Sequence, residues 1–162
     1  MATISHPGFR HLVEDWGGCS LHFSEMIDAE AHLAQGRYER WYADASPCPD
    51  RVVFQIVGAD EEVLVRAAAS LASQDCAGID LNMGCSAPHI FRRGAGIAWM
   101  TDPDRASRLA GRLRTAVGAK SLSVKFRLGE EENPESLVAL GKALQSAGVV
   151  LGYAEQGTAG IA

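Results

Sequence analysis

A lone thiol follows directly on a stretch of alternating polar and apolar residues. Over residues 79–83 the polar Asp80 and Asn82 alternate with apolar side chains, the pattern of a β-strand whose two faces differ. Gly84 breaks this pattern, and Cys85 follows on a predicted loop. A thiol ionises close enough to neutral pH to hold or give a proton. Cys85 is therefore a candidate general acid or nucleophile, with a structural cysteine as the alternative.

Polar residues also interrupt two other predicted strands. Gln55 stands in an apolar run, and Lys125 and Arg127 alternate with apolar residues in a further strand. A lysine inside a sheet needs an anion beside it because burying its charge alone is costly. Lys125 therefore either pairs with Glu25 or Asp80 or contacts an anionic cofactor. Gln55 bonds either a planar heterocycle or its strand neighbours.

Three further features lie near these candidates. Gly94-Ala95-Gly96 precedes a predicted helix and can free backbone amides for a phosphate. His89 follows Cys85 by four residues, but the sequence places no His–Asp pair to activate the thiol as a protease nucleophile. Glu25 is either an acid–base group or a structural partner of the basic residues.

Hydrophobic periodicity places these residues on a regular series of strands and helices. The expected strands cover residues 19–27, 51–58, 78–84 and 121–129. The expected helices lie around residues 7–14, 29–35, 60–71, 102–117 and 134–147. Residues 37–50 should be irregular because they contain Pro47 and Pro49. Residues 149–162 begin like a strand and then lose the core pattern.

The alternation of strands and helices predicts an α/β fold with a parallel sheet. The polar residues of different strands share one face near the carboxyl ends, which is typical of the mouth of a (β/α)8 barrel. We therefore expect a partial TIM barrel of about four parallel strands over residues 1–148, followed by an irregular tail at 149–162. A flavodoxin-like open sheet is the alternative, although its first strand should begin the chain.

Composition and charge limit which functions and locations are expected. The 162 residues carry a net charge of −5, which argues against bulk nucleic-acid binding, but residues 91–128 hold nine basic and only two acidic residues. This segment is either a solvated helix face or an anchor for a phosphate or polyanion. Apolar runs are too short for a membrane span, and a signal peptide is lacking, so a cytoplasmic location is expected. The four cysteines match no Cys-x-x-Cys spacing, and no metal site is expected.

Several segments together resemble the tRNA-dihydrouridine synthases. Asp80-Leu-Asn-Met-Gly-Cys85, followed by Gly94-Ala95-Gly96, is similar to the signature of that family. Residues 23–27, 54–58 and 123–129 resemble its second, third and fifth strands, and residues 1–10 resemble the loop after its first strand. The similarity runs in register from residue 1 to about residue 148. It implies an FMN-binding (β/α)8 barrel that reduces uridine in tRNA to 5,6-dihydrouridine with NADPH.

The resemblance also implies roles for individual residues. Cys85 would be the general acid that protonates C5 of the uracil as the flavin delivers a hydride to C6. The FMN would be contacted by Gln55, Lys125 and Asn82, and the last of these would also help to hold the base. The substrate RNA would be bound by Arg127, His89, Arg92 and Arg93. The base must leave its stack to reach the flavin.

The chain departs from the family pattern in two ways. Ser86 stands where the family has proline, and His89 stands where it has another basic residue. The family's first strand, its last three strands and its helical tRNA-binding domain lack counterparts, so a truncated barrel that binds FMN poorly is expected, with exposed strand edges that favour self-association. The alternatives are a non-catalytic remnant and another FMN barrel, such as a dihydroorotate dehydrogenase-like enzyme.

Overall fold

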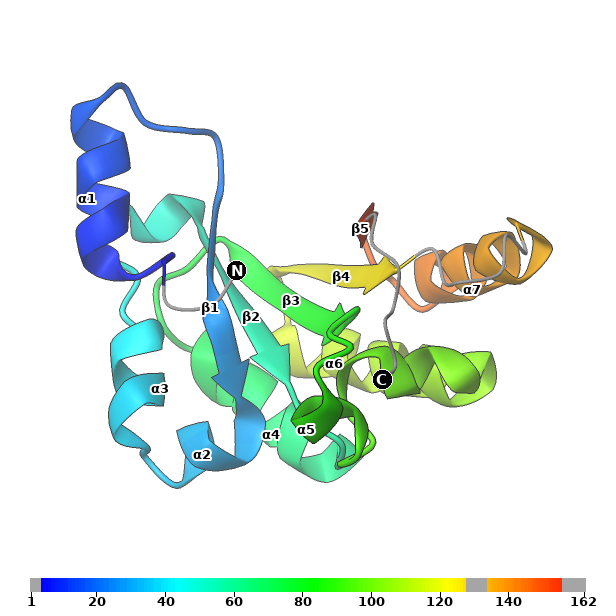
Figure 1. The fold of residues 1–162 in the computed structure, drawn as a ribbon. Helices are drawn as coiled ribbons and strands as arrows, with labels where there is room; N and C mark the ends of the chain where they lie inside the picture. Colours follow the sequence, from blue (N-terminus) through cyan, green and yellow to red (C-terminus); the bar gives the residue numbers. More distant parts are fainter. Residues whose placement is uncertain (1–3, 128–133, 156–162) are drawn as a thin grey trace.

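One parallel sheet organises the molecule (Figure 1). The computed structural model describes residues 4–127 and 134–155. Its strands follow one another in the sheet in sequence order: β1 (His22–Asp28), β2 (Val52–Val57), β3 (Gly78–Met83), β4 (Ser121–Arg127) and β5 (Leu151–Glu155). All neighbours are parallel. This order is that of consecutive strands in a (β/α)8 barrel, whereas a flavodoxin-like sheet reverses its strand order. The expected α/β partial barrel is confirmed.

The helices begin where the sequence provides caps. Asp60 Oδ1 accepts a hydrogen bond from the Val63 amide at 3.0 Å, and Asp102 Oδ1 accepts one from the Arg105 amide at 2.9 Å. Such side-chain oxygens satisfy amides that the first helical turn leaves open. The helices of the described chain are α1 (Pro7–Asp15), α2 (Ala29–Leu33), α3 (Arg37–Tyr42), α4 (Glu61–Ala72), α5 (Pro88–Phe91), α6 (Pro103–Val117) and α7 (Pro134–Ser146).

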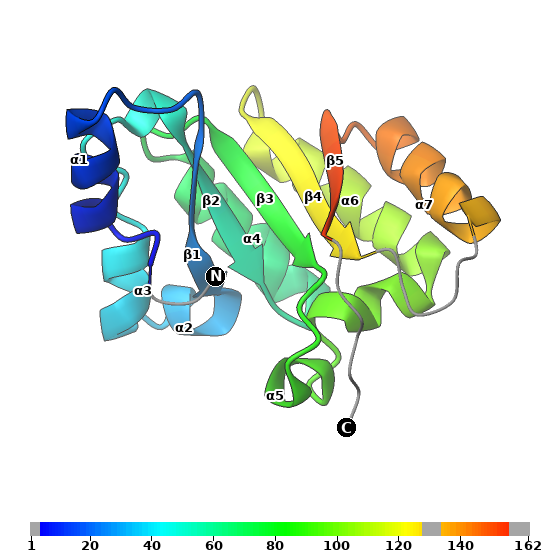
Figure 2. The same cartoon turned by 45° about the horizontal axis from the view of Figure 1, so that its top comes forward.

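Helices α4 and α6 lie behind the sheet in Figure 2, while the described helices leave its front face uncovered. The side chains of the strands differ between the two faces in the same way. Their alternate residues form one core with the helices, among them Phe54, Ile79, Leu81 and Val124, each fully buried. The residues between them point to the other face, as the alternation predicts. In a barrel that face is the interior, so it is where a site is expected.

Two segments differ from their predicted structure. Residues 37–50 were expected to be irregular, but α3 occupies Arg37–Tyr42 and a 3₁₀ turn covers Pro49–Arg51. Pro47 and Pro49 lie beyond the end of α3, so they do not interrupt it. The strand that begins the tail extends to Glu155 and pairs with β4, which adds a fifth strand after the expected boundary at residue 148. β1 and β5 are the edge strands, and self-association through them stays a prediction.

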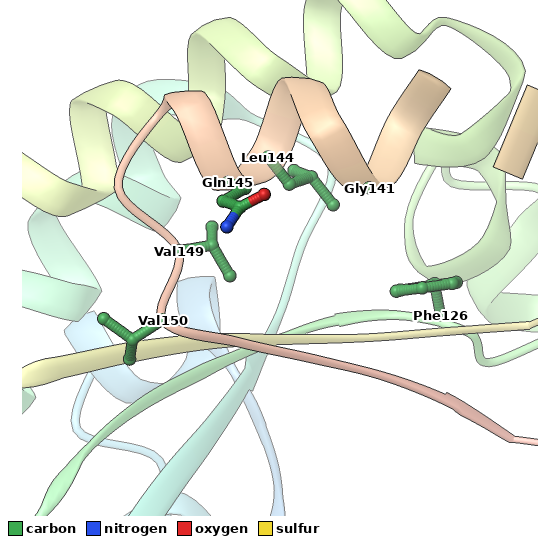
Figure 3. Close-up of a pocket in the computed structure, with 6 residues that line it drawn as sticks. All are labelled: Phe126, Gly141, Leu144, Gln145, Val149 and Val150. Atoms are coloured by element: carbon green, nitrogen blue, oxygen red, sulfur yellow. The ribbon is translucent and has the colours of Figure 1, made fainter. Parts of the chain in front are cut away.

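A cavity of about 250 Å³ lies between α7 and the β4–β5 edge, on the helix side of the sheet (Figure 3). Its lining is formed by Phe126, Gly141, Leu144, Gln145, Val149 and Val150. No side chain in this set titrates, so the cavity offers no acid–base group. None of the described helices has the length and hydropathy to cross a bilayer.

Candidate active site

A chain of buried hydrogen bonds crosses the front face from β4 to the loop after β3. Strand register aligns Gln55 with Asp80 and Asp80 with Ser123. Asp80 accepts from the Ser123 hydroxyl through Oδ1 and from Gln55 Nε2 through Oδ2, both at 2.6 Å. Gln55 Oε1 in turn accepts from Asn82 Nδ2 at 2.9 Å. Asp80 has no exposed surface, so these bonds replace water at its carboxylate.

Asn82 links this chain of hydrogen bonds to the loop that carries Cys85. Its Oδ1 accepts from the amides of Gly84 at 3.1 Å and Cys85 at 2.9 Å. An asparagine that binds the amides two and three residues later fixes a turn at the end of a strand. The position of Cys85 is therefore set by a side chain that is itself held by Gln55. The structure thus brings together Cys85, Asn82 and Gln55, three of the predicted site residues.

Lys125 and Arg127 flank Gly84. Arg127 Nε donates to the Gly84 carbonyl at 2.5 Å. A Cβ built on Gly84 would lie 3.5 Å from Arg127 Cγ and 3.6 Å from Lys125 Cε, so both basic side chains run beside this glycine. Lys125 pairs with Asn82 in the strand register. Both predicted basic residues therefore belong to the same end of the sheet as Cys85.

Gly96 holds the other side of the Cys85 loop. The Ile97 amide donates to the Cys85 carbonyl at 3.0 Å, and a Cβ on Gly96 would lie only 2.3 Å from that carbonyl oxygen. The sequence suggested instead that Gly94-Ala95-Gly96 frees amides for a phosphate. The amide of Gly94 donates to the Phe91 carbonyl at 2.9 Å, and that of Ala95 donates to the Ile90 carbonyl at 3.2 Å. The motif therefore packs against the thiol loop, and two of its three amides are already bonded.

Cys85 itself is half-buried. Its side chain packs against a small apolar cluster formed by Val57, Ile90 and Ala95, beside Met26 of β1. This cluster joins the carboxyl ends of β1 and β2 to the loop after β3. The thiol is thus placed on the front face with an apolar wall on one side and the polar row on the other.

The residues predicted to bind RNA differ in their surroundings. His89 and Arg92 are exposed on and after α5. Arg93 Nη1 instead pairs with Asp28 Oδ2 at 2.7 Å and Nη2 lies 3.4 Å from Glu30, and the hydrogen bond to Asp28 raises the pKa of the Arg93 guanidinium. This ion pair ties the α5 segment to the end of β1. RNA contact by the three residues stays a prediction.

Two of the arginines on α6 pair with acidic residues of α4. Arg105 pairs with Glu61 at 3.3 Å and stacks on Trp99 at 3.9 Å from its ring centre. Arg112 pairs with Glu62 at 2.5 Å, and the hydrogen bond to that carboxylate raises the pKa of Arg112. The interpretation as a polyanion anchor is therefore weakened for α6, because acidic residues of α4 already neutralise these guanidinium groups.

Two contributions to the site escaped the sequence reasoning. The alternation of residues in β4 puts Ser123 on the polar face, but its bond to Asp80 depends on strand register, which pattern alone does not give. Glu25 was considered as a partner for the basic residues, and it accepts from the backbone amides of Ile4 and Ser5 at 2.6 and 2.5 Å. The carboxylate therefore anchors the described start of the chain against β1.

Comparison with known proteins decides the family. A model of the dihydrouridine synthases matches residues 1–151. The chain belongs to the dihydrouridine synthase family. Among curated relatives, the tRNA-dihydrouridine(16) synthase of Cupriavidus necator is 35% identical over 138 residues, which cover 80% of this chain and 42% of that protein. The family match decides against the dihydroorotate dehydrogenase-like alternative.

Other relatives come from other organisms. A probable tRNA-dihydrouridine synthase of Rhodobacter capsulatus is 32% identical over 154 residues, covering 92% of this chain and 46% of that protein. The tRNA-dihydrouridine(47) synthase [NAD(P)(+)] of Cryptococcus neoformans is 32% identical over 135 residues, with coverages of 80% and 18%. The chain thus spans less than half the length of each of these relatives.

Proposed function

We propose that this chain carries part of the active site of a tRNA-dihydrouridine synthase, in which uridine in tRNA is reduced to 5,6-dihydrouridine with FMN and NADPH. The observation that carries the proposal is the fixed loop at the end of β3. Asn82 and Gly96 hold Cys85 from two sides, and the polar row lies next to it. A loop fixed in this way keeps an acid in place for a bound base.

The donor set on the front face suits a flavin. Each amide nitrogen of Gln55 and Asn82 carries two hydrogens, and the hydrogen bonds within the row use one of each. The second hydrogens and the Lys125 ammonium are donors matched to the carbonyl oxygens and ring nitrogens of an isoalloxazine. Bound FMN would supply the hydride that reaches C6 of the uracil. Gln55, Asn82 and Lys125 would orient the flavin.

Cys85 would complete the reduction by giving its thiol proton to C5. The uracil gains a hydride at C6 and a proton at C5, the C5–C6 double bond becomes a single bond, and the thiolate then regains a proton from solvent. The apolar wall of Val57, Ile90 and Ala95 limits water around the sulfur. His89 and Arg92, exposed beside the loop, would contact the RNA backbone around the extruded base together with Arg127 and Arg93.

The test compares wild-type protein with Cys85→Ala and Cys85→Ser. FMN affinity is measured by flavin fluorescence, and dihydrouridine is measured after incubation with NADPH and unmodified tRNA. We expect unchanged FMN affinity and at least about a hundredfold slower reduction in both variants, because a general acid contributes on that order. Equal rates in wild type and Cys85→Ala would refute the assigned role. FMN binding without any reduction by the wild type would favour the non-catalytic alternative.

A further inference from the structure

A second cluster of reactive side chains lies at the opposite end of the sheet. Glu14 lies in the last turn of α1, Cys19 lies in the connection to β1, and His22 is the first residue of β1. Since the strands are parallel, the first residue of β1 lies at the other end from Cys85, which follows the last residue of β3. One ligand atom from each member of the cluster lies within 4.8 Å of the others. This placement separates the cluster from the candidate active site.

The distances within the cluster suit a shared metal ion. Cys19 Sγ lies 3.4 Å from His22 Nε2, and this nitrogen lies 2.8 Å from Glu14 Oε1. In a tetrahedral zinc site, bond lengths of about 2.3 Å to sulfur and 2.0–2.1 Å to nitrogen put these two ligands about 3.5 Å apart. The sulfur and nitrogen therefore already have nearly the required separation. The carboxylate oxygen would have to move about 0.5 Å further from the ring nitrogen. Its separation from the sulfur, which is within 4.8 Å, would have to become about 3.5 Å.

The surroundings of the cluster favour an ordered site. The His22 side chain is only 7% exposed and that of Glu14 is 20% exposed. Arg51 pairs with the second carboxylate oxygen of Glu14 and donates to the Cys19 carbonyl at 2.8 Å. It thus orients both an acidic ligand and the cysteine loop, as outer-sphere partners do in metal sites. Glu14 Oε1 faces the imidazole of His22 and also accepts from Arg51 Nη1 at 3.1 Å.

The charge balance is also favourable. A thiolate, a carboxylate and a neutral imidazole supply two negative charges, and the Arg51 guanidinium supplies one positive charge. A bound dication would leave the cluster with a net charge of +1. Solvent can reach this charge because Cys19 is exposed. Thiolate with imidazole selects zinc and related borderline ions over magnesium or calcium.

We propose that Glu14, Cys19 and His22 form a binding site for a zinc-like divalent cation, with water at the fourth position, that clips α1 to the start of β1. The three residues do not have the spacing of a Cys-x-x-Cys motif, so sequence pattern does not indicate this site. The fold creates the site by folding α1 back beside β1. The ion would stabilise the α1–β1 connection, which lies away from the uridine-reducing end.

The test titrates Zn²⁺ into untagged, metal-free protein in competition with a chromophoric chelator. We expect one ion per chain, and a loss of more than about tenfold in affinity for both Cys19→Ser and His22→Gln, since removal of even an outer-sphere partner costs that much. Cys85→Ser and His11→Gln are the matched controls, because they remove a thiol and an exposed histidine outside the cluster. Both controls should bind zinc like the wild type.

Two further measurements keep the result independent of folding defects. Co²⁺ in place of zinc should give a thiolate-to-cobalt absorption band that Cys19→Ser abolishes and Cys85→Ser retains. Saturating zinc should raise the melting temperature of the wild type and leave that of Cys19→Ser unchanged. Because Cys19 is exposed, its replacement by serine should not unfold the chain. Absence of zinc binding, or binding that Cys19→Ser does not weaken, would overturn the proposal and leave a hydrogen-bonded cluster only.

Discussion

Replacing Gly96 with alanine should destabilise the fold and displace Cys85. The glycine has a φ of +60°, and the added Cβ would lie 2.3 Å from the Cys85 carbonyl oxygen and 3.0 Å from Ile90 Cγ2. To restore a contact of 3.0 Å the carbonyl must withdraw by about 0.7 Å, which would stretch the 3.0 Å bond from the Ile97 amide beyond hydrogen-bond range. The substitution therefore removes a bond that holds the reactive loop.

The expected loss of stability combines two terms. An alanine in left-handed conformation costs about 1–2 kcal/mol, and a lost backbone hydrogen bond costs about 1 kcal/mol. The lower entropy of the unfolded alanine chain offsets about 0.5 kcal/mol of this. Gly96→Ala should therefore lower the free energy of unfolding by about 2 kcal/mol.

Gly111→Ala provides the matched control. A Cβ at Gly111, within α6, meets nothing within 4 Å, so this change should raise stability by about 1 kcal/mol through helix propensity. Urea unfolding followed by tryptophan fluorescence measures both variants, and dihydrouridine formation below the unfolding transition measures the displacement of the thiol. Similar unfolding free energies for the two variants, or full activity of Gly96→Ala, would refute the role assigned to the close contact.

Two other predictions follow from buried polar groups. Asp80→Ala should lower the free energy of unfolding by more than about 2 kcal/mol and slow uridine reduction, because Gln55 and Ser123 lose their acceptor. Asp80→Asn should keep most of the stability and of the reduction rate, since its amide can still accept from Gln55 and donate to the serine hydroxyl. Equal free energies of unfolding for the two variants in urea would contradict this. Burial lowers the pKa of His32 from 6.5 in the folded protein. On acidification the unfolded chain therefore takes up this proton at a higher pH than the folded chain does, and stability should fall as pH drops below 6.5. Urea midpoints against pH should show this decline in the wild type and in His11→Gln but not in His32→Gln.

The periodicity of the sequence was sufficient to predict β3, β4 and the two faces of each. Apolar and polar residues alternate through β3 and β4, so the sides taken by Asp80, Asn82 and Ser123 followed from local pattern. What the pattern did not provide was the register between strands. The bonds of Asp80 to Gln55 and Ser123 depend on that register, which long-range packing sets.

Contacts between distant segments account for the other differences. Arg105 and Arg112 look like an anion-binding stripe in sequence, and only the packing of α6 on α4 shows that Glu61 and Glu62 occupy them. Gly96 looks like part of a phosphate loop until its distance from the Cys85 carbonyl is known. A glycine motif indicates that the backbone approaches another group closely, but only the fold shows whether that group is a ligand or, as here, another part of the backbone.

The ion pair between Arg93 and Asp28 changes what an approaching polyanion can gain. A phosphate that contacts Arg93 meets a guanidinium already paired with a carboxylate 2.7 Å away, so it gains less interaction energy there than at an unpaired arginine. The Asp28 carboxylate also repels the incoming phosphate. Arg92, exposed one residue earlier, has no such ion pair within the described part of the chain. Arg93 should therefore contribute less to RNA binding than Arg92, because Asp28 and Glu30 lie beside it.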